Sequence, residues 1–487
     1  MSHRHRAILA AGAPVIFAGM LAGQAPSETI TGPKDQKSVS VTIYNDDLAL
    51  VKDQREVKLG KGDLDLAFQE VSAQIRPETA LLRNLTAPAG FWINEQNFDF
   101  DLLSPAKLLE KYVGQRVLVL CQKPNPDGAG SKELREEAEV LATNGGVVLK
   151  FADRIETTVP GRIIFPKVPE NLRARPTLVL NLHSPAERSQ KLELSYLTGG
   201  LSWRADYVAN LAPDEKTLDL SGWVTLTNQS GVTYPNATLQ LVAGDVNRVQ
   251  ERLRIFPMKA APGIAEAAPA PPQMKEEGLF EYHLYTLDRP TTLKENQTKQ
   301  VALLTTSGVP VRKEYLLHGE NYYYQRQCDD LGDKLKVGVF VEFDNKTESR
   351  MGMPLPKGTV RVYKRDSEGR AQFVGEDAID HTPKNETVRL KLGDAFDVTA
   401  KRKQTDFKSL GRIAPWHYVY ESAFEVTFKN AKKEPVTVSA IEPIFGDWEI
   451  TQHSHAFTKD SAGSARFKVE VPAEGAAKLS YRARCRW

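Results

Sequence analysis

Two histidines near the C-terminus have the spacing that most resembles a metal site. His453 and His455 are separated by one residue, so both side chains face the same way if 449–457 is a strand. Imidazole is a common zinc ligand, and Asp447 or Glu449 could add a carboxylate. The alternative is a pair of exposed polar residues on an edge strand. We favour that alternative, because no third ligand stands at a diagnostic spacing.

Other reactive patterns are weaker. Asp329, Asp330 and Asp333 offer oxygen ligands of the kind that calcium prefers, but their spacing matches no EF-hand loop. The chain contains no Gly-x-Ser-x-Gly motif and no His-Glu-x-x-His motif. We therefore predict no catalytic residue and no cofactor, and an enzyme is the less favoured class.

Three consecutive tyrosines, Tyr322, Tyr323 and Tyr324, are candidates for a binding surface. In a strand, consecutive side chains alternate between faces, so at least one ring is expected to point outward. Exposed aromatic rings stack on sugars or anchor a protein partner. The alternative is that two rings belong to the core and one decorates the edge of a sheet.

The stretch 192–249 predicts a series of short strands joined by tight turns. Trp203 and Tyr207 alternate with Arg204 and Asp206, which places one set on a buried face and the other toward solvent. Arg204 and Asp206 could pair along that outer face, and Trp203 fits a core or interface support. All three residues are candidates for a binding site in an antiparallel sheet.

This stretch also carries a resemblance. The run from Gly200 to Tyr207, the segment GWVTLTNQSGVTYPNATLQLVAGDVN and the downstream run PLPKGTVRVYKRD resemble the bacterial domain-of-unknown-function 4139 family. That family includes relatives of the mucoidy-inhibitor A proteins. The resemblance runs from about Val39 to the C-terminus, and it implies no catalytic residue because the family has no established chemistry. The chain lacks a sustained heptad pattern, so no coiled-coil arm is expected.

A single short helix is predicted over 104–113. Ser104 fits the N-cap position, Pro105 the first helical position and Gly114 the end of the helix. After the helix, several short strands separated by turns predict a small inserted β-barrel.

The expected fold is all-β and mainly antiparallel, a multi-domain β-sandwich with this small inserted β-barrel and one short helix. The predicted domains are a signal peptide over 1–25, an N-terminal β region over 28–113, the inserted barrel over 114–165, a β-sandwich over 166–310 with the family motif and an Ala/Pro linker at 260–278, and a C-terminal β-sandwich over 311–487.

The N-terminal segment predicts export. The residues MSHRHR precede an apolar run from Ala7 to Ala22, which is the pattern of a secretory signal peptide. Cleavage after Gly23, after Ala25 or after Ser27 fits the sequence, and an uncleaved anchor is the alternative. The expected location is therefore periplasmic or extracellular, with no stable membrane span after cleavage.

The balance of charges bears on whether nucleic acid is a partner. Lys and Arg number 64 against 62 Asp and Glu, and both signs are dispersed, so nucleic acid is not an expected partner.

Cys121, Cys328 and Cys485 are the only cysteines, and we expect buried free thiols with one disulfide as the alternative.

The expected function is that of an exported, non-catalytic binding or scaffolding protein that meets a protein or a glycan of the cell envelope. The second hypothesis is a divergent metal-dependent hydrolase of envelope material that uses His453, His455 and nearby acids. The oligomeric state is not predicted.

Overall fold

The computed structural model describes residues 27–99, 101–124, 131–169, 172–244, 246–247, 274–328 and 331–487. The predicted signal peptide, residues 260–273 of the predicted linker, and Asp329 and Asp330 lie outside the described residues. The linker prediction does not hold for its last residues, which pair with the following strand as β17 (Lys275–Leu279).

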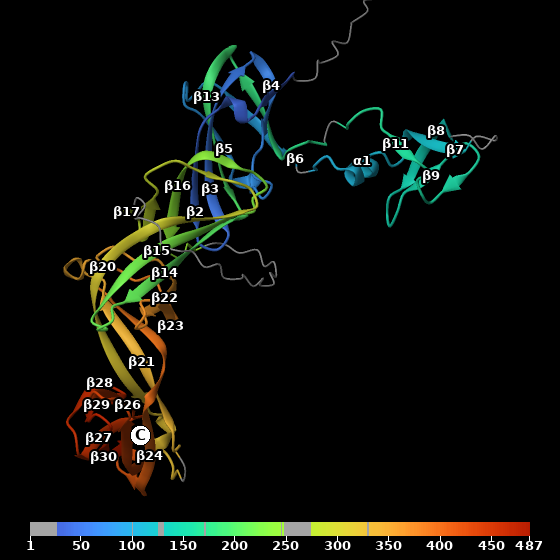
Figure 1. Cartoon of the computed structure of the whole chain (residues 1–487). Coiled ribbons are helices and arrows are strands. Elements are labelled where there is room, and N and C mark those ends of the chain that lie inside the picture. The colour runs from blue at the N-terminus through green and yellow to red at the C-terminus, as the bar shows by residue number, and fades with distance from the viewer. Residues whose placement is uncertain are drawn as a thin grey trace, which may run out of the picture. The chain divides into compact units, whose positions relative to one another are not determined.

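The described chain is mostly β, as predicted, and its strands belong to several sheets (Figure 1). It has one α-helix, α1 (Pro105–Lys111), and four short 3-10 helices, η1 (Pro33–Asp35), η2 (Pro77–Thr79), η3 (Asn321–Tyr324) and η4 (Thr347–Ser349). No helix in this described part is long and apolar enough to cross a membrane.

The chain divides into two compact units. The first comprises Met1–Lys37, Gln54–Val71 and Leu82–Glu193, and the second comprises Ser38–Asp53, Ser72–Leu81 and Leu194–Trp487. Each unit therefore contains more than one segment of the chain. The predicted boundary at 310/311 falls inside one long strand, β20 (Gln297–His318).

A four-stranded sheet of the first unit has the order β1-β4-β12-β6. Its strands are β1 (Ser27–Thr31), β4 (Gly62–Gln69), β6 (Trp92–Asp99) and β12 (Thr177–Ser184). The first pair is parallel and the other two are antiparallel.

The predicted inserted barrel is an open five-stranded sheet. Its order is β10-β9-β8-β7-β11, and no pairing among the described residues closes it. The strands are β7 (Arg116–Pro124), β8 (Ser131–Ala142), β9 (Val148–Lys150), β10 (Ile155–Glu156) and β11 (Arg162–Ile164). The barrel prediction is wrong because the strands at both edges are only two and three residues long, which leaves little backbone to pair.

The predicted helix is confirmed. The Ser104 side chain accepts a hydrogen bond from the Lys107 backbone N–H at 3.2 Å, which is the expected N-cap contact. Tyr112 follows the helix and is buried in the core of the five-stranded sheet, and its hydroxyl donates to Lys167 O at 2.7 Å. The C-terminal end of the helix thereby packs against the core of that sheet.

An eight-stranded sheet has the order β17-β18-β16-β2-β3-β13-β5, with β19 paired to β16. Its further strands are β2 (Gln36–Tyr44), β3 (Leu48–Leu59), β5 (Leu81–Asn84), β13 (Arg188–Thr198), β16 (Tyr234–Ala243), β18 (Tyr282–Thr286) and β19 (Thr291–Leu293). The sequence alternation of Leu192, Leu194 and Tyr196 is confirmed, since all three are buried in β13.

The largest sheet has thirteen strands, with the main order β23-β22-β14-β15-β20-β21-β24-β25-β30-β27. Its strands besides β20 are β14 (Leu201–Leu211), β15 (Thr217–Asn228), β21 (Leu335–Asp344), β22 (Gly358–Arg365), β23 (Ala371–Ile379), β24 (Thr387–Ile413), β25 (Trp416–Asn430), β26 (Val436–Pro443), β27 (Asp447–His453), β28 (Phe457–Ser461), β29 (Ser464–Val471) and β30 (Gly475–Arg486). Strands β26, β28 and β29 form a branch of this sheet.

Strands β24, β25 and β30 share one hydrophobic core with the branch strands β26 and β29. The apolar alternations that the sequence shows at Phe424, Val426 and Phe428 and at Phe467, Val469 and Val471 all point into this core. The long strand β24 is paired with β21 along its first part and with β25 along its second part. One strand therefore links the family-motif half of the sheet to the C-terminal core.

Candidate functional site

Strand β14 carries the run that resembles the family, and it pairs in parallel with β22. The downstream run PLPKGTVRVYKRD therefore lies directly beside Ala205 to Leu211, which includes the end of the first run at Tyr207. The Tyr207 hydroxyl donates to Pro356 O at 2.8 Å. At Gly358 a Cβ atom would stand 2.2 Å from a backbone oxygen of β14, so this close approach requires glycine. The two runs are thus packed against each other.

The predicted binding residues Trp203, Arg204 and Asp206 lie on opposite faces of β14. Trp203 is buried, whereas Arg204 is exposed and its Nε lies 3.2 Å from an oxygen of Asp206, as the sequence predicted. Asp206 also accepts hydrogen bonds from Arg361 Nη1 at 3.0 Å and from Thr225 Oγ1 at 2.9 Å. It thereby joins three neighbouring strands. A role of these residues in ligand binding stays a prediction.

Tyr322, Tyr323 and Tyr324 lie in the 3-10 helix η3 and not in a strand. Three residues per turn send the rings in three directions instead of two. Tyr322 is 44% exposed, while Tyr323 and Tyr324 are buried. Two rings in the core and one outside agree with the alternative that the sequence left open. Binding by Tyr322 stays a prediction.

Tyr324 contacts an ion pair that is fully buried in the C-terminal core. Arg402 binds Glu442 through two parallel hydrogen bonds of 2.7 Å, and neither side chain is exposed to solvent. The hydroxyls of Tyr324 and Tyr481 lie 2.8 Å apart, and Tyr324 also donates to Glu442 Oε2 at 3.1 Å. Gly319 leaves room for the carboxylate, since a Cβ there would stand 2.5 Å from Glu442 Oε2.

The electrostatics of this buried pair favour a structural role. Burial, the largest single influence, lowers the pKa of Arg402, but Glu442, Tyr481 and Tyr324 together outweigh burial and hold that pKa well above its ordinary value. Burial raises the pKa of Tyr324 and of Tyr481, so both hydroxyls remain protonated donors. These groups therefore satisfy one another inside the core and are closed off from any reactant.

The two histidines of the predicted metal site are not on one strand. Strand β27 ends at His453, whose ring packs edge-on against Phe457, and His455 lies beyond the strand with its Nδ1 atom 2.9 Å from Ser454 Oγ. Across the described ranges, no three His, Cys, Asp or Glu residues are grouped so that they could hold a metal ion.

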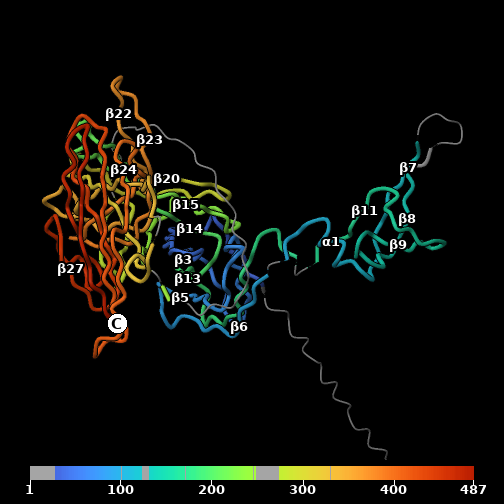
Figure 2. The backbone as a smooth tube through the Cα atoms, turned by 90° about the horizontal axis from the view of Figure 1, so that it is seen from below, coloured from blue at the N-terminus to red at the C-terminus, as the bar shows by residue number. Residues whose placement is uncertain are grey.

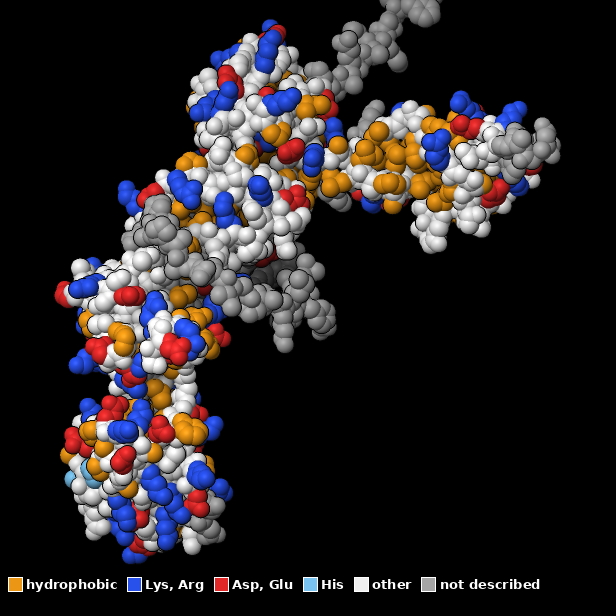
Figure 3. Space-filling model, viewed as in Figure 1, with side chains coloured by type: hydrophobic (Ala, Val, Ile, Leu, Met, Phe, Trp, Pro, Cys, Tyr) orange, Lys and Arg blue, Asp and Glu red, His pale blue; other side chains and the backbone are white. Residues whose placement is uncertain are grey.

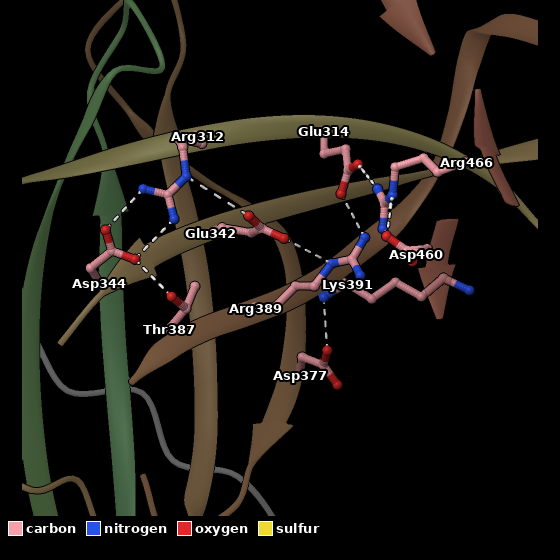
Figure 4. Close-up of polar contacts among 10 residues, drawn as sticks. All are labelled: Arg312, Glu314, Glu342, Asp344, Asp377, Thr387, Arg389, Lys391, Asp460 and Arg466. Carbon is pink, nitrogen blue, oxygen red and sulfur yellow. Dashed lines mark hydrogen bonds and ion pairs between the residues drawn. The ribbon is translucent and has the colours of Figure 1, made fainter. Parts of the chain in front are cut away.

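Seven charged residues of alternating sign form what we call the ion-pair ribbon, drawn in Figure 4. It crosses β20, β21 and β24 and ends on β28 and β29. Its members in order of contact are Asp344, Arg312, Glu342, Arg389, Glu314, Arg466 and Asp460.

Glu314 is the junction of the ribbon. One of its carboxylate oxygens lies 2.6 Å from Arg389 Nη2 and the other lies 2.7 Å from Arg466 Nη1. Arg466 is on β29, so this carboxylate ties the branch of the sheet to the long strands β20 and β24. At the other end Asp344 accepts two hydrogen bonds from Arg312, of 2.9 and 3.0 Å, and one from Thr387. The ribbon is a network and not an isolated surface pair.

At one end of the C-terminal core, five aromatic rings form what we call the aromatic surface. Tyr418 and Tyr420 continue the alternation of the buried residues of β25, but neither of them is buried. The two tyrosines pack against each other and against Trp487, Phe407 packs on Tyr420, and Phe445 packs on Trp487. Tyr418 is 54% exposed and Phe445 is 50% exposed, so large apolar area faces solvent.

The rings of the aromatic surface are held in a fixed arrangement. Tyr418 and Tyr420 stack with an angle of 7° between their planes, and Tyr420 stacks on Phe407 at 24°. The backbone of Trp487 exchanges hydrogen bonds with that of Tyr418, at 3.0 and 3.1 Å. Rigid rings lose little conformational entropy on binding, which suits them to ligand contact.

A family model described as a domain of unknown function (DUF4139) matches residues 192–487. The chain belongs to the DUF4139 family. The match begins at Leu192, later than the Val39 suggested by the resemblance. No curated protein sequence matches the chain significantly. The family-motif strands, the buried ion pair, the ion-pair ribbon and the aromatic surface all fall within the matched DUF4139 region.

The three thiols of this DUF4139 protein are free. Cys121 and Cys485 are buried as predicted, whereas Cys328 is partly exposed because it follows η3 at the edge of the core. Burial raises the pKa of Cys485 to about 12, so this thiol remains protonated.

Sequence reasoning missed the aromatic surface of the DUF4139 domain. Its members are distant along the chain, from Phe407 to Trp487. The available signal was the period-two series Tyr418, Tyr420, Phe424 and Val426, which shows that these tyrosines share the face of the core residues. Which part of that face is covered depends on where the branch strands end, and the local pattern does not contain that information.

The buried ion pair gives the first prediction. Arg402→Met leaves the Glu442 carboxylate buried without its partner, so we expect the free energy of unfolding to fall by about 3–5 kcal/mol. The double variant Arg402→Met/Glu442→Leu removes both charges and should recover most of that loss. Denaturant titration followed by tryptophan fluorescence measures both. Lys403→Met, at an exposed neighbouring position, is the control. Equal midpoints for Arg402→Met and Lys403→Met would contradict the assignment.

The ion-pair ribbon gives the second prediction. Hydrogen bonds from Arg312 and Thr387 hold the pKa of Asp344 well below its ordinary value of 3.8. A lowered folded-state pKa contributes stability above the ordinary pKa, and that contribution is lost as the pH falls below it. Asp344→Asn should therefore be less stable than the wild type at neutral pH.

That difference should shrink in acid, below the ordinary carboxyl pKa of 3.8. Thermal unfolding at a series of pH values measures it. Glu470→Gln, at an exposed carboxylate outside the ribbon, should show no such pH-dependent difference. A constant gap between Asp344→Asn and the wild type at every pH would argue against the ribbon's role.

Proposed function

We propose that this DUF4139 protein is an exported, non-catalytic binding protein of the cell envelope and that it contacts its ligand through the aromatic surface. The observation that carries the proposal is the exposure of Tyr418 and Phe445 at the end of a face that is otherwise buried. Contiguous exposed apolar area beside polar residues is a feature of interaction sites. Sheltering each half-exposed ring from water would contribute about 1 kcal/mol to binding.

The charged groups with strong pKa shifts support a binding role over catalysis. They lie in the buried Arg402–Glu442 cluster or in exposed ion pairs such as those of the ribbon. In an active site, shifted groups would converge on an open cleft. The hydrolase hypothesis with His453 and His455 has no separate observation in its favour among the described residues.

Export is the second part of the proposal. Its support is the basic and apolar N-terminal sequence, which ends close to the first described strand, β1, at Ser27. We place the mature protein in the periplasm or outside the cell. A protein or a glycan of the envelope is the partner class that this location offers.

We also infer that the C-terminal core is the centre of a β-sandwich. Side chains of β24, β25 and β30 on one side and of β26 and β29 on the other contribute to a single cluster of buried residues. Two sets of strands that bury their apolar faces against each other define that architecture. The sandwich would hold the aromatic surface on a rigid base.

Binding to isolated bacterial envelopes tests the aromatic surface. In Tyr418→Ser/Phe445→Ser, two exposed rings are lost, so we expect the apparent affinity to fall roughly 10- to 30-fold. Co-sedimentation of the purified mature chain with envelopes measures it. The matched control is Phe396→Ser, which removes a ring that is 95% exposed in the same unit but outside the surface. Equal affinities of the double variant and this control would refute the proposed role.

Fractionation of cells that express the full chain tests export. We expect the protein in the periplasm or the medium, with a mass that corresponds to cleavage after Gly23, Ala25 or Ser27. A chain that starts at Met with the first 26 residues deleted should remain in the cytoplasm. Full-length protein in the cytoplasmic fraction would count against export.

A further inference from the structure

We propose that the end of the β24–β25 hairpin, residues 407–418, docks on an anionic lipid surface. This inference deepens the proposed function and rests on it, because it names what the binding protein meets in the envelope. We call these residues the hairpin tip. It adjoins the aromatic surface, to which it contributes Phe407 and Tyr418 at its two ends.

The hairpin tip presents aliphatic side chains that the core does not use. Residues 408–415 are all exposed. Leu410 is 39% exposed and Ile413 is 48% exposed, and Ile413 pairs with Trp416 where the hairpin closes. In Figure 2 the end of this hairpin lies beside the C-terminus. Two exposed aliphatic side chains at a projecting turn can insert into the apolar part of a lipid surface, whereas a small-molecule ligand would need a concave pocket.

The charges around these aliphatic side chains are positive. Between Phe407 and Tyr418 the sequence contains Lys408 and Arg412 but no Asp or Glu. Asp406 and Glu421, the carboxylates that flank the tip along the sequence, are already paired with arginines. Asp406 lies 2.7 Å from Arg482 Nη1 and 3.6 Å from Lys408 Nζ, and Glu421 lies 2.6 Å from Arg484 Nη2.

The arginines of β30 near the tip are paired with carboxylates, so the positive character belongs to Lys408 and Arg412 of the tip itself. Figure 3 shows Lys and Arg side chains interspersed with Asp and Glu side chains on the visible face of the C-terminal part of the chain. A patch of basic residues attracts the negative headgroups of an anionic leaflet, and the attraction weakens as salt is added. The charge of the hairpin tip therefore complements anionic lipid.

The aromatic residues complete the pattern. Trp and Tyr side chains favour the boundary between acyl chains and headgroups, because each has an apolar ring and a polar atom. Trp416, Tyr418 and Trp487 lie at or directly beside the hairpin tip. A glycan would find stacking rings here, but Leu410 and Ile413 can neither stack on a sugar nor bond its hydroxyls. A lipid surface accounts for all three features together.

Flotation with phospholipid vesicles tests the inference. The purified mature chain is mixed with vesicles of phosphatidylcholine alone or of phosphatidylcholine with phosphatidylglycerol. We expect flotation with the anionic vesicles, roughly tenfold weaker binding to the neutral ones, and loss of binding at high salt. No flotation with anionic vesicles would overturn the proposal.

Two variants separate the parts of the hairpin tip. Leu410→Asp/Ile413→Asp should abolish flotation with either kind of vesicle, because the insertion point is lost. Lys408→Gln/Arg412→Gln should bind anionic vesicles only as weakly as neutral ones. The controls are Phe396→Asp and Lys433→Gln/Lys468→Gln, which change exposed residues of the same unit elsewhere. Wild-type binding by both tip variants would refute the assignment.

Quenching of tryptophan fluorescence gives a further test, which starts from the wild-type protein bound to vesicles. Brominated acyl chains should quench tryptophan fluorescence of the bound wild type, and Trp416→Phe should lose a large part of that quenching. Equal quenching in Trp416→Phe and the wild type would place the contact elsewhere.

The envelope experiment distinguishes failure of the lipid inference from failure of the proposed function. If envelopes bind through the aromatic surface but vesicles do not bind, the lipid inference fails while the proposed function stands. Binding to lipid-free peptidoglycan that the tip variants disrupt would make the partner a glycan and would also overturn the lipid inference. If neither envelopes nor vesicles bind, both proposals fail.

Discussion

The Arg402–Glu442 ion pair constrains the whole C-terminal core. Two charges removed from water destabilise a fold unless their hydrogen bonds are satisfied, and here two tyrosine hydroxyls and a bidentate contact satisfy most of them. The partners come from β24, β26, β30 and η3, so these four elements must meet at one point. The position of η3, and with it that of the tyrosine triplet, follows from this requirement.

The need of charged groups for partners also explains the contrast between the ion-pair ribbon and the aromatic surface. On β20, β21 and β24 the outward side chains are matched in sign across the strands, so the ion-pair ribbon leaves few charges without a partner. At the end of β25 the apolar face is no longer buried, and the aromatic surface remains partly exposed. The charges of the ion-pair ribbon satisfy one another, whereas the rings of the aromatic surface remain partly exposed. The proposed function is therefore assigned to the aromatic surface.

Local patterns predicted the elements well. The N-cap at Ser104 and the buried alternation of β13 and β14 both depend on neighbouring residues in the chain. Predictions that required distant contacts were less successful. The five-stranded sheet is open instead of closed, and the tyrosine triplet is a 3-10 helix, because strand pairing and the buried ion pair override the local alternation.

The sequence by itself determined the β class, the single helix, the family and the candidate histidines and tyrosines, since each depends on residue type and on a short-range period. Only the tertiary structure decided that Tyr324 supports a buried charge, that His453 and His455 stand apart, and that rings from Phe407 to Trp487 converge on one exposed surface. The physical reason is that side-chain periodicity fixes which face a residue occupies, whereas burial depends on where another, distant strand ends.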